Sequence, residues 1–200
     1  MKRKTVCGWG INDMDTPTKS DPAYNIWTHL LKRCYGPYQK LDNPSYIGCS
    51  VSEDFRHRSD FNKWFLEQDW YGNELDKDII EPFNKLYSPE TCCFVPLALN
   101  TFFTTRGKGR GLYPLGVRIM PGGRFEAKIN DSFLGKILSL GRFGTAMEAH
   151  KAWQVRKLEL LMIWVEISKS WKDQRISEGL LKHAAILQEH IDTGVETIYF

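Results

Sequence analysis

The sequence lacks several features that mark common classes of protein. It has no run of about 18 apolar residues, so we expect no transmembrane helix and no membrane partner. Its first ten residues are basic but contain no apolar stretch, so we expect no secretory signal. The five cysteines form no C-x-x-C pair and are odd in number, which argues against a zinc ribbon and a disulfide framework. We therefore expect buried thiols and a cytoplasmic location.

The charge of the chain is unevenly distributed. Of the 200 residues, 42% are hydrophobic and 26% are charged, which is typical of a globular protein of one or two domains. The net charge is only +3, yet residues 101–160 hold 11 lysines and arginines against 4 aspartates and glutamates. Such a basic segment favours a local site for a polyanion, although an ordinary solvated surface would also explain it.

A short glycine-rich and basic segment, Gly107–Gly111, has the composition of a linker. We place a domain boundary there and predict domains over 1–105 and 106–172, followed by a C-terminal helix within 173–200. The elements expected before the linker are an irregular stretch over 1–20, a helix capped by Asp21 and stopped by Gly36, a short helix capped by Asp60, strands over Leu75–Ile80 and Cys92–Val95, and a helix over Pro96–Thr104.

After the linker, apolar and polar residues alternate with a period of two, which predicts three short antiparallel strands. The apolar face is expected to carry Val117, Ile119, Phe125, Ala127, Ile129, Leu138 and Leu140. Thr145 and Glu148 form a capping box that begins a long helix, with Ala149, Ala152, Trp153, Arg156, Leu160, Ile163, Trp164 and Ile167 on one side. We expect this helix to cover the apolar face, and a last helix over 174–190. The predicted fold class is α+β.

The opposite face of this sheet is polar and cationic. A three-stranded ribbon of this kind has the size and charge to enter the major groove of DNA, where arginine reads guanine and asparagine reads adenine. The residues expected to contact DNA are Arg118, Arg124, Lys128, Asn130, Ser139 and Arg142, with Lys108 and Arg110 of the linker. A half-solvated sheet with ordinary surface charge is the alternative.

Four motifs in this half keep the order and spacing of a known family. They are Gly116-Val117-Arg118, Gly123-Arg124-Phe125-Glu126-Ala127, Leu140-Gly141-Arg142-Phe143-Gly144-Thr145, and Glu148-Ala149 with Ala152-Trp153. Over about 45 residues the chain closely resembles the ethylene-response-factor (Apetala-type) DNA-binding domain. The resemblance implies a sheet in the major groove and a base-reading role for Arg118. Met120, Lys128, Asn130 and Ser139 depart from the family pattern, so a different target sequence is implied.

The first half resembles the front of phage and intron-type HNH homing endonucleases, over about 80 residues. The motifs are Trp27 with Arg33-Cys34-Tyr35, Tyr46-Ile47-Gly48-Cys49-Ser50-Val51, Phe61 with Trp64, Leu75-Asp76-Lys77-Asp78, Tyr87-Ser88-Pro89-Glu90-Thr91-Cys92, and Asn100. The resemblance implies a ββα site in which Asp76 and Asn100 hold Mg²⁺. The general-base position falls on Lys77, which is a poor base at neutral pH, and Asp78 is a possible substitute. Alternatively, the acids only cap turns in a nuclease scaffold that no longer cleaves.

These observations leave three hypotheses for function. The first is a phage-type protein that binds double-stranded DNA and whose HNH-like half has weak or no cleavage activity, acting in the host cytoplasm. The second is an active Mg²⁺-dependent HNH homing endonuclease. The third is an interaction factor that binds a host protein or a second copy through C-terminal helices carrying Trp164 and Trp171.

Overall fold

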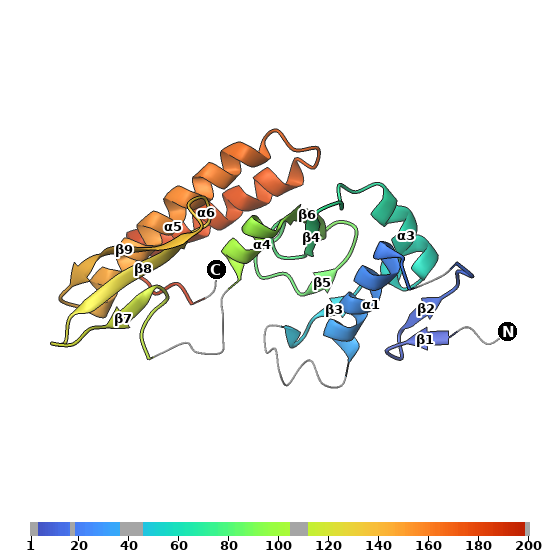
Figure 1. The fold of residues 1–200 in the computed structure, drawn as a ribbon, viewed down its shortest axis with the longest axis horizontal. Helices are drawn as coiled ribbons and strands as arrows, with labels where there is room; N and C mark the ends of the chain where they lie inside the picture. Colours follow the sequence, from blue (N-terminus) through green and yellow to red (C-terminus); the bar gives the residue numbers. More distant parts are fainter. Residues whose placement is uncertain (1–3, 17–18, 37–45, 105–111, 199–200) are drawn as a thin grey trace. The chain divides into compact units, whose positions relative to one another are not determined.

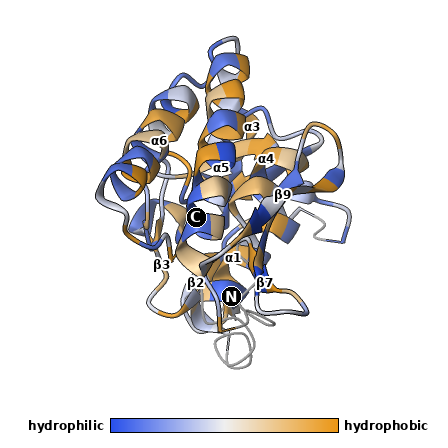
Figure 2. Cartoon of the chain, turned by 90° about the vertical axis from the view of Figure 1, so that its left-hand side faces the viewer, coloured by the Kyte–Doolittle hydropathy of each residue, from blue (hydrophilic) through white to orange (hydrophobic). Residues whose placement is uncertain are grey.

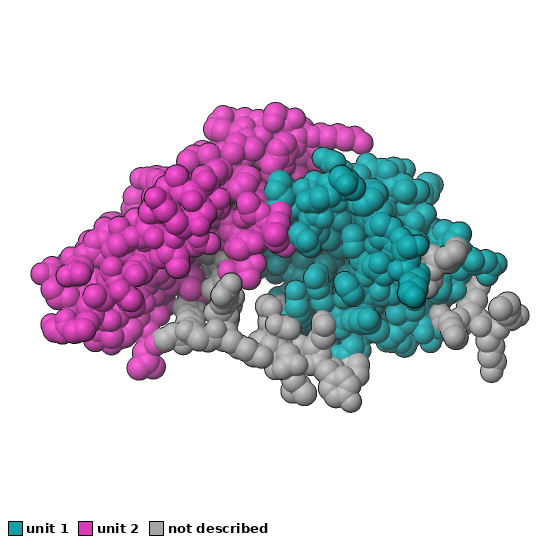
Figure 3. All heavy atoms as spheres, in the orientation of Figure 1, with its two compact units in different colours: residues 1–96 teal, residues 97–200 magenta. Residues whose placement is uncertain are grey.

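The computed structural model describes residues 4–16, 19–36, 46–104 and 112–198 (Figure 1). The chain has the predicted α+β class and folds as two compact units, Met1–Pro96 and Leu97–Phe200 (Figure 3). The glycine-rich segment in which we placed the domain boundary lies outside the described residues, and so do Lys108 and Arg110. Each unit is described separately below.

The first unit begins with a β-hairpin, where the sequence predicted an irregular stretch. Strands β1 (Lys4–Val6) and β2 (Gly10–Asn12) pair antiparallel. Cys7 and Gly8 between them have φ of 51° and 73°. Consecutive residues with positive φ match the right-handed twist of paired strands, so the turn fixes a hairpin whose strands are too short to give a periodic pattern.

Helix α1 (Pro22–Tyr35) confirms the predicted first helix. The Asp21 side chain accepts a hydrogen bond from the Tyr24 amide at 3.2 Å, and Pro22 occupies the first turn. Its apolar stripe is buried in the core of the unit, and the indole nitrogen of Trp27 donates to the Phe55 carbonyl at 2.7 Å. The helix therefore contributes both a packed face and a satisfied polar anchor to this core.

The second helix, α3 (Arg58–Leu66), begins two residues before the predicted cap at Asp60 and follows a short 3-10 turn, η2 (Glu53–Phe55). The reason is a cap supplied from far away in the sequence. The Asp13 carboxylate accepts hydrogen bonds from the Ser59 amide at 3.0 Å and from the Ser59 hydroxyl at 2.7 Å. A local pattern does not reveal a partner 46 residues away.

Two small sheets complete this unit. β4 (Asn73–Asp76) pairs antiparallel with β6 (Cys93–Pro96), and β3 (Ser50–Val51) pairs parallel with β5 (Leu86–Tyr87). The strand predicted over Leu75–Ile80 therefore ends at Asp76. It ends there because the Asp76 side chain accepts hydrogen bonds from the next backbone amides and turns the chain.

The second unit contains α4 (Leu97–Phe103) and an antiparallel sheet in the order β7 (Val117–Ile119), β8 (Phe125–Asp131), β9 (Lys136–Phe143). The long helix α5 (Ala146–Ser168) packs on one face of this sheet, and α6 (Arg175–Thr193) packs on α5. The capping box predicted at the start of α5 is present. The predicted sheet, covering helix and C-terminal helix are thus confirmed. Ile119, expected on the covered apolar face, is instead 50% exposed.

The stripe predicted along α5 is correct at its start, and at its end it is correct for Trp164 but wrong for the two isoleucines. Ala149, Trp153 and Leu160 are buried, but Ile163 and Ile167 are exposed. Helix α5 packs against α6 as well as against the sheet. Hydrophobic and hydrophilic residues are interleaved along both helices (Figure 2). A single-face prediction fails where a helix has two partners.

Candidate nucleic-acid interface

The register of the three strands brings the predicted polar residues together on the face of the sheet that α5 does not cover. Arg118 on β7 lies opposite Glu126 on β8, which lies opposite Arg142 on β9. Two residues further along β8, on the same face, Lys128 pairs with Ser139. A β-bulge between Ala127 and Lys128 shifts the register of β9, so the following outward row pairs Asn130 with Ile137.

Most of these side chains are accessible. Arg118, Arg124, Asn130, Ser139 and Arg142 are exposed, and Lys128 is partly exposed. Ile137, which the sequence reasoning did not place on this face, is 67% exposed. We call the set Arg118, Arg124, Glu126, Lys128, Asn130, Ile137, Ser139 and Arg142 the open face.

The centre of the open face is an acidic residue that the list of expected contacts omitted. The carboxylate of Glu126 accepts a hydrogen bond from Arg118 Nε at 2.6 Å and another from the Ser139 hydroxyl at 2.7 Å. The ammonium of Lys128 lies 3.7 Å from the same carboxylate. The side chain of Glu126 is only 8% exposed, because its neighbours enclose it. The sequence did indicate that Glu126 lies on the polar face, because apolar and polar residues alternate along β8.

These contacts determine the charge state at the centre. The hydrogen bonds from Ser139 and Arg118 hold the pKa of the Glu126 carboxyl below its usual range, and the nearby positive charges act in the same direction. Glu126 is therefore ionised at neutral pH. The face then combines four basic side chains with one carboxylate, and it remains cationic.

Arg118 is held by one nitrogen only. Its Nε donates to Glu126, its side chain is 54% exposed, and among the described residues none accepts a hydrogen bond from its two terminal nitrogens. The guanidinium group therefore keeps its end-on pair of donors for a ligand. At the edge of the face, a terminal nitrogen of Arg124 donates to the Arg142 carbonyl at 3.2 Å and ties two cationic positions together.

The far end of the sheet is fixed to the helix below it. Asp131 is 1% exposed; its carboxylate accepts from the Phe133 and Leu134 amides at 3.0 and 2.9 Å and from Arg156 on α5 at 2.9 Å. Burial by itself would raise the pKa of the Asp131 carboxyl. Together the hydrogen bonds outweigh burial, so the pKa is lowered. The turn between β8 and β9 is thus anchored to α5.

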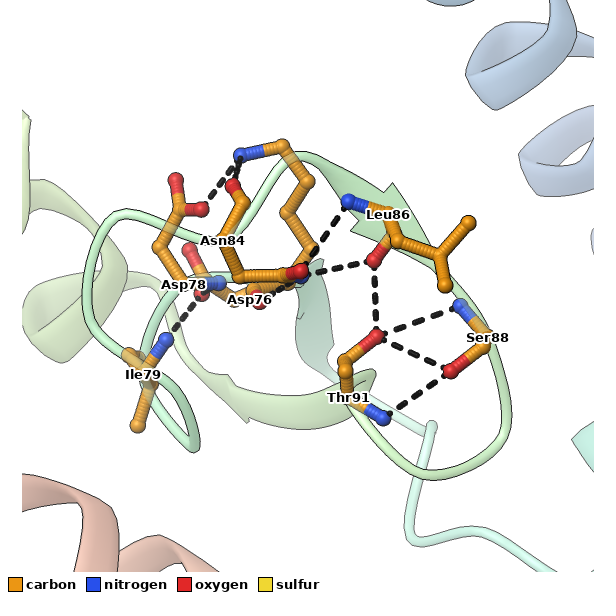
Figure 4. A network of polar contacts seen from close by, with 8 residues as sticks. Asp76, Asp78, Ile79, Asn84, Leu86, Ser88 and Thr91 are labelled. Carbon is orange, nitrogen blue, oxygen red and sulfur yellow. Dashed lines mark hydrogen bonds and ion pairs between the residues drawn. The ribbon is translucent and has the colours of Figure 1, made fainter. Parts of the chain in front are cut away.

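The predicted nuclease residues lie in a polar turn of the first unit (Figure 4). Asp76 Oδ1 accepts the amide hydrogens of Asp78 at 2.6 Å and Ile79 at 2.8 Å. Lys77 is 5% exposed; its ammonium pairs with the Asp78 carboxylate and donates to the Asn84 carbonyl at 2.9 Å. Asp76, Lys77 and Asp78 are therefore brought together, but as parts of one turn that they stabilise.

This turn does not fit a magnesium site. One oxygen of Asp76 already accepts two amides, and the Lys77 cation lies close enough to act on the same carboxylate. Burial, followed by the charge of Asp78, raises the pKa of Asp76. Among the described residues, no three His, Cys, Asp or Glu side chains are grouped so that they could hold a metal ion. Asn100, the second expected ligand, lies on α4 in the other unit. There its backbone carbonyl accepts a hydrogen bond from the Thr104 hydroxyl at 3.1 Å.

The aromatic residues expected to face a protein partner are used inside the second unit. Trp164 is 6% exposed; its indole nitrogen donates to the Ser132 hydroxyl at 3.2 Å, and its ring lies 4.8 Å from that of Phe133. Trp171 lies against Trp164, with ring centres 6.4 Å apart. Partner binding by the C-terminal helices stays a prediction, and Trp164 is not available for it in this arrangement.

No family model, no curated protein and no solved structure matches this chain. No helix in the described part of the chain is long and apolar enough to cross a membrane. The function is therefore argued from the geometry of the chain itself. The fold defines an α+β protein in which a helix-backed, three-stranded sheet presents a cationic face.

Proposed function

We propose that the chain binds double-stranded DNA by placing the open face of β7–β9 in the major groove. One observation carries the proposal: arginine and lysine side chains gather on the uncovered face of the sheet, while α5 covers the other face. Neighbouring strands lie about 4.8 Å apart, so three strands span about 10 Å, and the major groove is about 12 Å wide. The ribbon matches the groove in width and in charge.

The side chains on this face also suit the chemistry of base edges. The end-on donors of Arg118 match the two acceptors of guanine, and the amide of Asn130 matches the donor and acceptor of adenine. The exposed Ile137 lies opposite Asn130 and can contact a thymine methyl group. Lys128, Arg124 and Arg142 would neutralise phosphates, which positions the protein without reading sequence.

The test is duplex binding by the double variant Arg118→Ala, Lys128→Ala. Bound sequences are first selected from random duplex DNA, and the affinity for the best duplex is then measured from about 50 to 200 mM salt. We expect the variant to lose at least about tenfold in affinity, because one base contact and one phosphate contact are removed. The slope of log affinity against log salt should become shallower by about one to two.

The matched control is Lys151→Ala, Lys182→Ala, which removes two exposed cations from α5 and α6 rather than from the sheet. It should bind as the parent does. Equal affinity in parent and sheet variant, or equal losses in both variants, would contradict the proposal, since the open face would then have no special part in binding.

A further inference from the structure

We propose that Glu126 is a positioning residue: it holds the guanidinium of Arg118 so that its two terminal nitrogens point out of the sheet toward a guanine. This inference rests on the proposed function, which it extends to the source of sequence specificity. It assigns a role in DNA recognition to an acidic residue, which would otherwise be expected to repel a polyanion.

The first observation is that Glu126 is enclosed and has all its partners on the open face. Both carboxylate oxygens are used, one by Arg118 Nε at 2.6 Å and the other by the Ser139 hydroxyl at 2.7 Å. A carboxylate that is 8% exposed is stable only with such partners. Three strands meet at this group, because Arg118 comes from β7, Glu126 from β8 and Ser139 from β9.

The second observation is which nitrogen of Arg118 is held. A bond at Nε fixes the plane of the guanidinium and leaves the pair of terminal nitrogens, which is the pair that can bond guanine O6 and N7 together. Without the carboxylate, the long side chain could turn and contact a phosphate instead. Holding the group in one orientation lowers the entropy that is lost on binding.

The third observation concerns Lys128, which lies 3.7 Å from the same carboxylate. Glu126 thus keeps Arg118 away from phosphates and offsets part of the positive charge that Lys128 offers to them. Removing its charge should release both cations, so that general attraction to DNA increases while discrimination between bases decreases. A residue that served only to stabilise the fold would not separate these two properties.

The experiment measures the affinity of the parent chain and of Glu126→Gln for two duplexes. One is the selected duplex, and the other has a single change from G·C to A·T, at the G·C pair where the parent discriminates most strongly. Glu166→Gln is the control, since it removes the same charge from an exposed site on α5. We expect the parent and the control to prefer the selected duplex at that position by at least about fivefold. In Glu126→Gln this preference should fall to about twofold or less, and the salt slope should steepen by about one.

A measurement on the parent chain without DNA tests the inference even if the Glu126→Gln variant does not fold. In the parent, the Arg118 Nε–H signal in nitrogen-15 NMR should exchange slowly with water and move as Glu126 is titrated. An Arg118 signal that exchanges rapidly, or an unchanged base preference in a folded Glu126→Gln, would overturn the inference while DNA binding itself stands. Failure of the parent to bind any duplex would instead overturn the proposed function, and this inference with it.

Discussion

Lys157 on α5 buries an ammonium group within the second unit. The residue is 8% exposed, and its ammonium donates to the Phe102 carbonyl and lies 3.4 Å from the centre of the Phe102 ring. These contacts favour the charged form, but burial opposes it and lowers the pKa of Lys157 to about 7. The residue therefore couples proton binding to the stability of this unit.

The sign of this coupling follows from the pKa values of the two states. The unfolded chain holds the proton up to about pH 10.4, whereas the folded chain releases it near pH 7, so the unfolded state binds more protons between these values. We expect the free energy of unfolding to rise with pH across this window, by up to about 4 kcal/mol. Below pH 7 the full cost of burying the charge is present.

Lys157→Met should remove this rise, since methionine fills a similar space without a titrating group. Denaturant unfolding from pH 7 to 10 measures it, with Lys151→Met, at an exposed site of the same helix, as the control. An identical pH dependence in the parent and in Lys157→Met would show that the ammonium is not the group that titrates.

At the scale of elements, the docking of α5 on the sheet depends on a glycine. Gly116 precedes β7 with φ of +76°, and a Cβ at this position would lie 2.0 Å from the Trp153 ring. The backbone of the sheet thus approaches the helix closely and at a conformation that other residues rarely adopt. Trp153 in turn is 7% exposed, so the ring has little room to move.

Gly116→Ala should lower the free energy of unfolding by about 2–4 kcal/mol, through overpacking against Trp153 and through backbone strain. The control is Gly122→Ala, where φ is +89° but a Cβ would meet nothing within 4 Å, so only the strain of about 1–2 kcal/mol applies. Urea unfolding of both variants measures the difference. A Gly116→Ala variant no less stable than Gly122→Ala would mean that the close approach is not a constraint.

The sequence predicted the elements that carry their own signals. The Asp21 cap, the capping box at Thr145 and the alternation of β7–β9 are local, and all are present in the structure. It missed what depends on distant partners, such as the Asp13 cap of α3 and the parallel pair β3–β5. Glu126 was missed because the partners that hold its carboxylate, Arg118 and Ser139, come from the two neighbouring strands.

At the scale of the whole molecule, the two units carry different kinds of polar chemistry. The second unit exposes its cations on the open face, whereas the first unit encloses Asp76, Lys77 and Asn84 in hydrogen bonds within one turn. In the first unit, the charged groups expected to form the nuclease site are bonded to one another and to the backbone of this turn.

Asp76→Asn tests cleavage without destroying this turn, since the amide oxygen can still accept the bonds from Asp78 and Ile79. We expect the parent and Asp76→Asn to give the same background of strand breaks on selected duplexes with Mg²⁺ or Mn²⁺, and equal duplex affinity. Nicking by the parent that disappears in Asp76→Asn would instead support an active metal-dependent endonuclease. Supercoiled plasmid relaxation is the sensitive assay.

The separation of the two faces of β7–β9 has a consequence for how target choice could diversify. Apart from the bulge in β9 and the exposed Ile119 of β7, residues that pack on α5 and residues that face outward alternate along the strands, so one set can change while the other stays constant. A library that randomises Lys128, Asn130, Ile137 and Ser139, and keeps Ala127 and Ile129, should yield many folded members with new preferences. Evolution has the same freedom, since substitutions outside the core leave its packing intact.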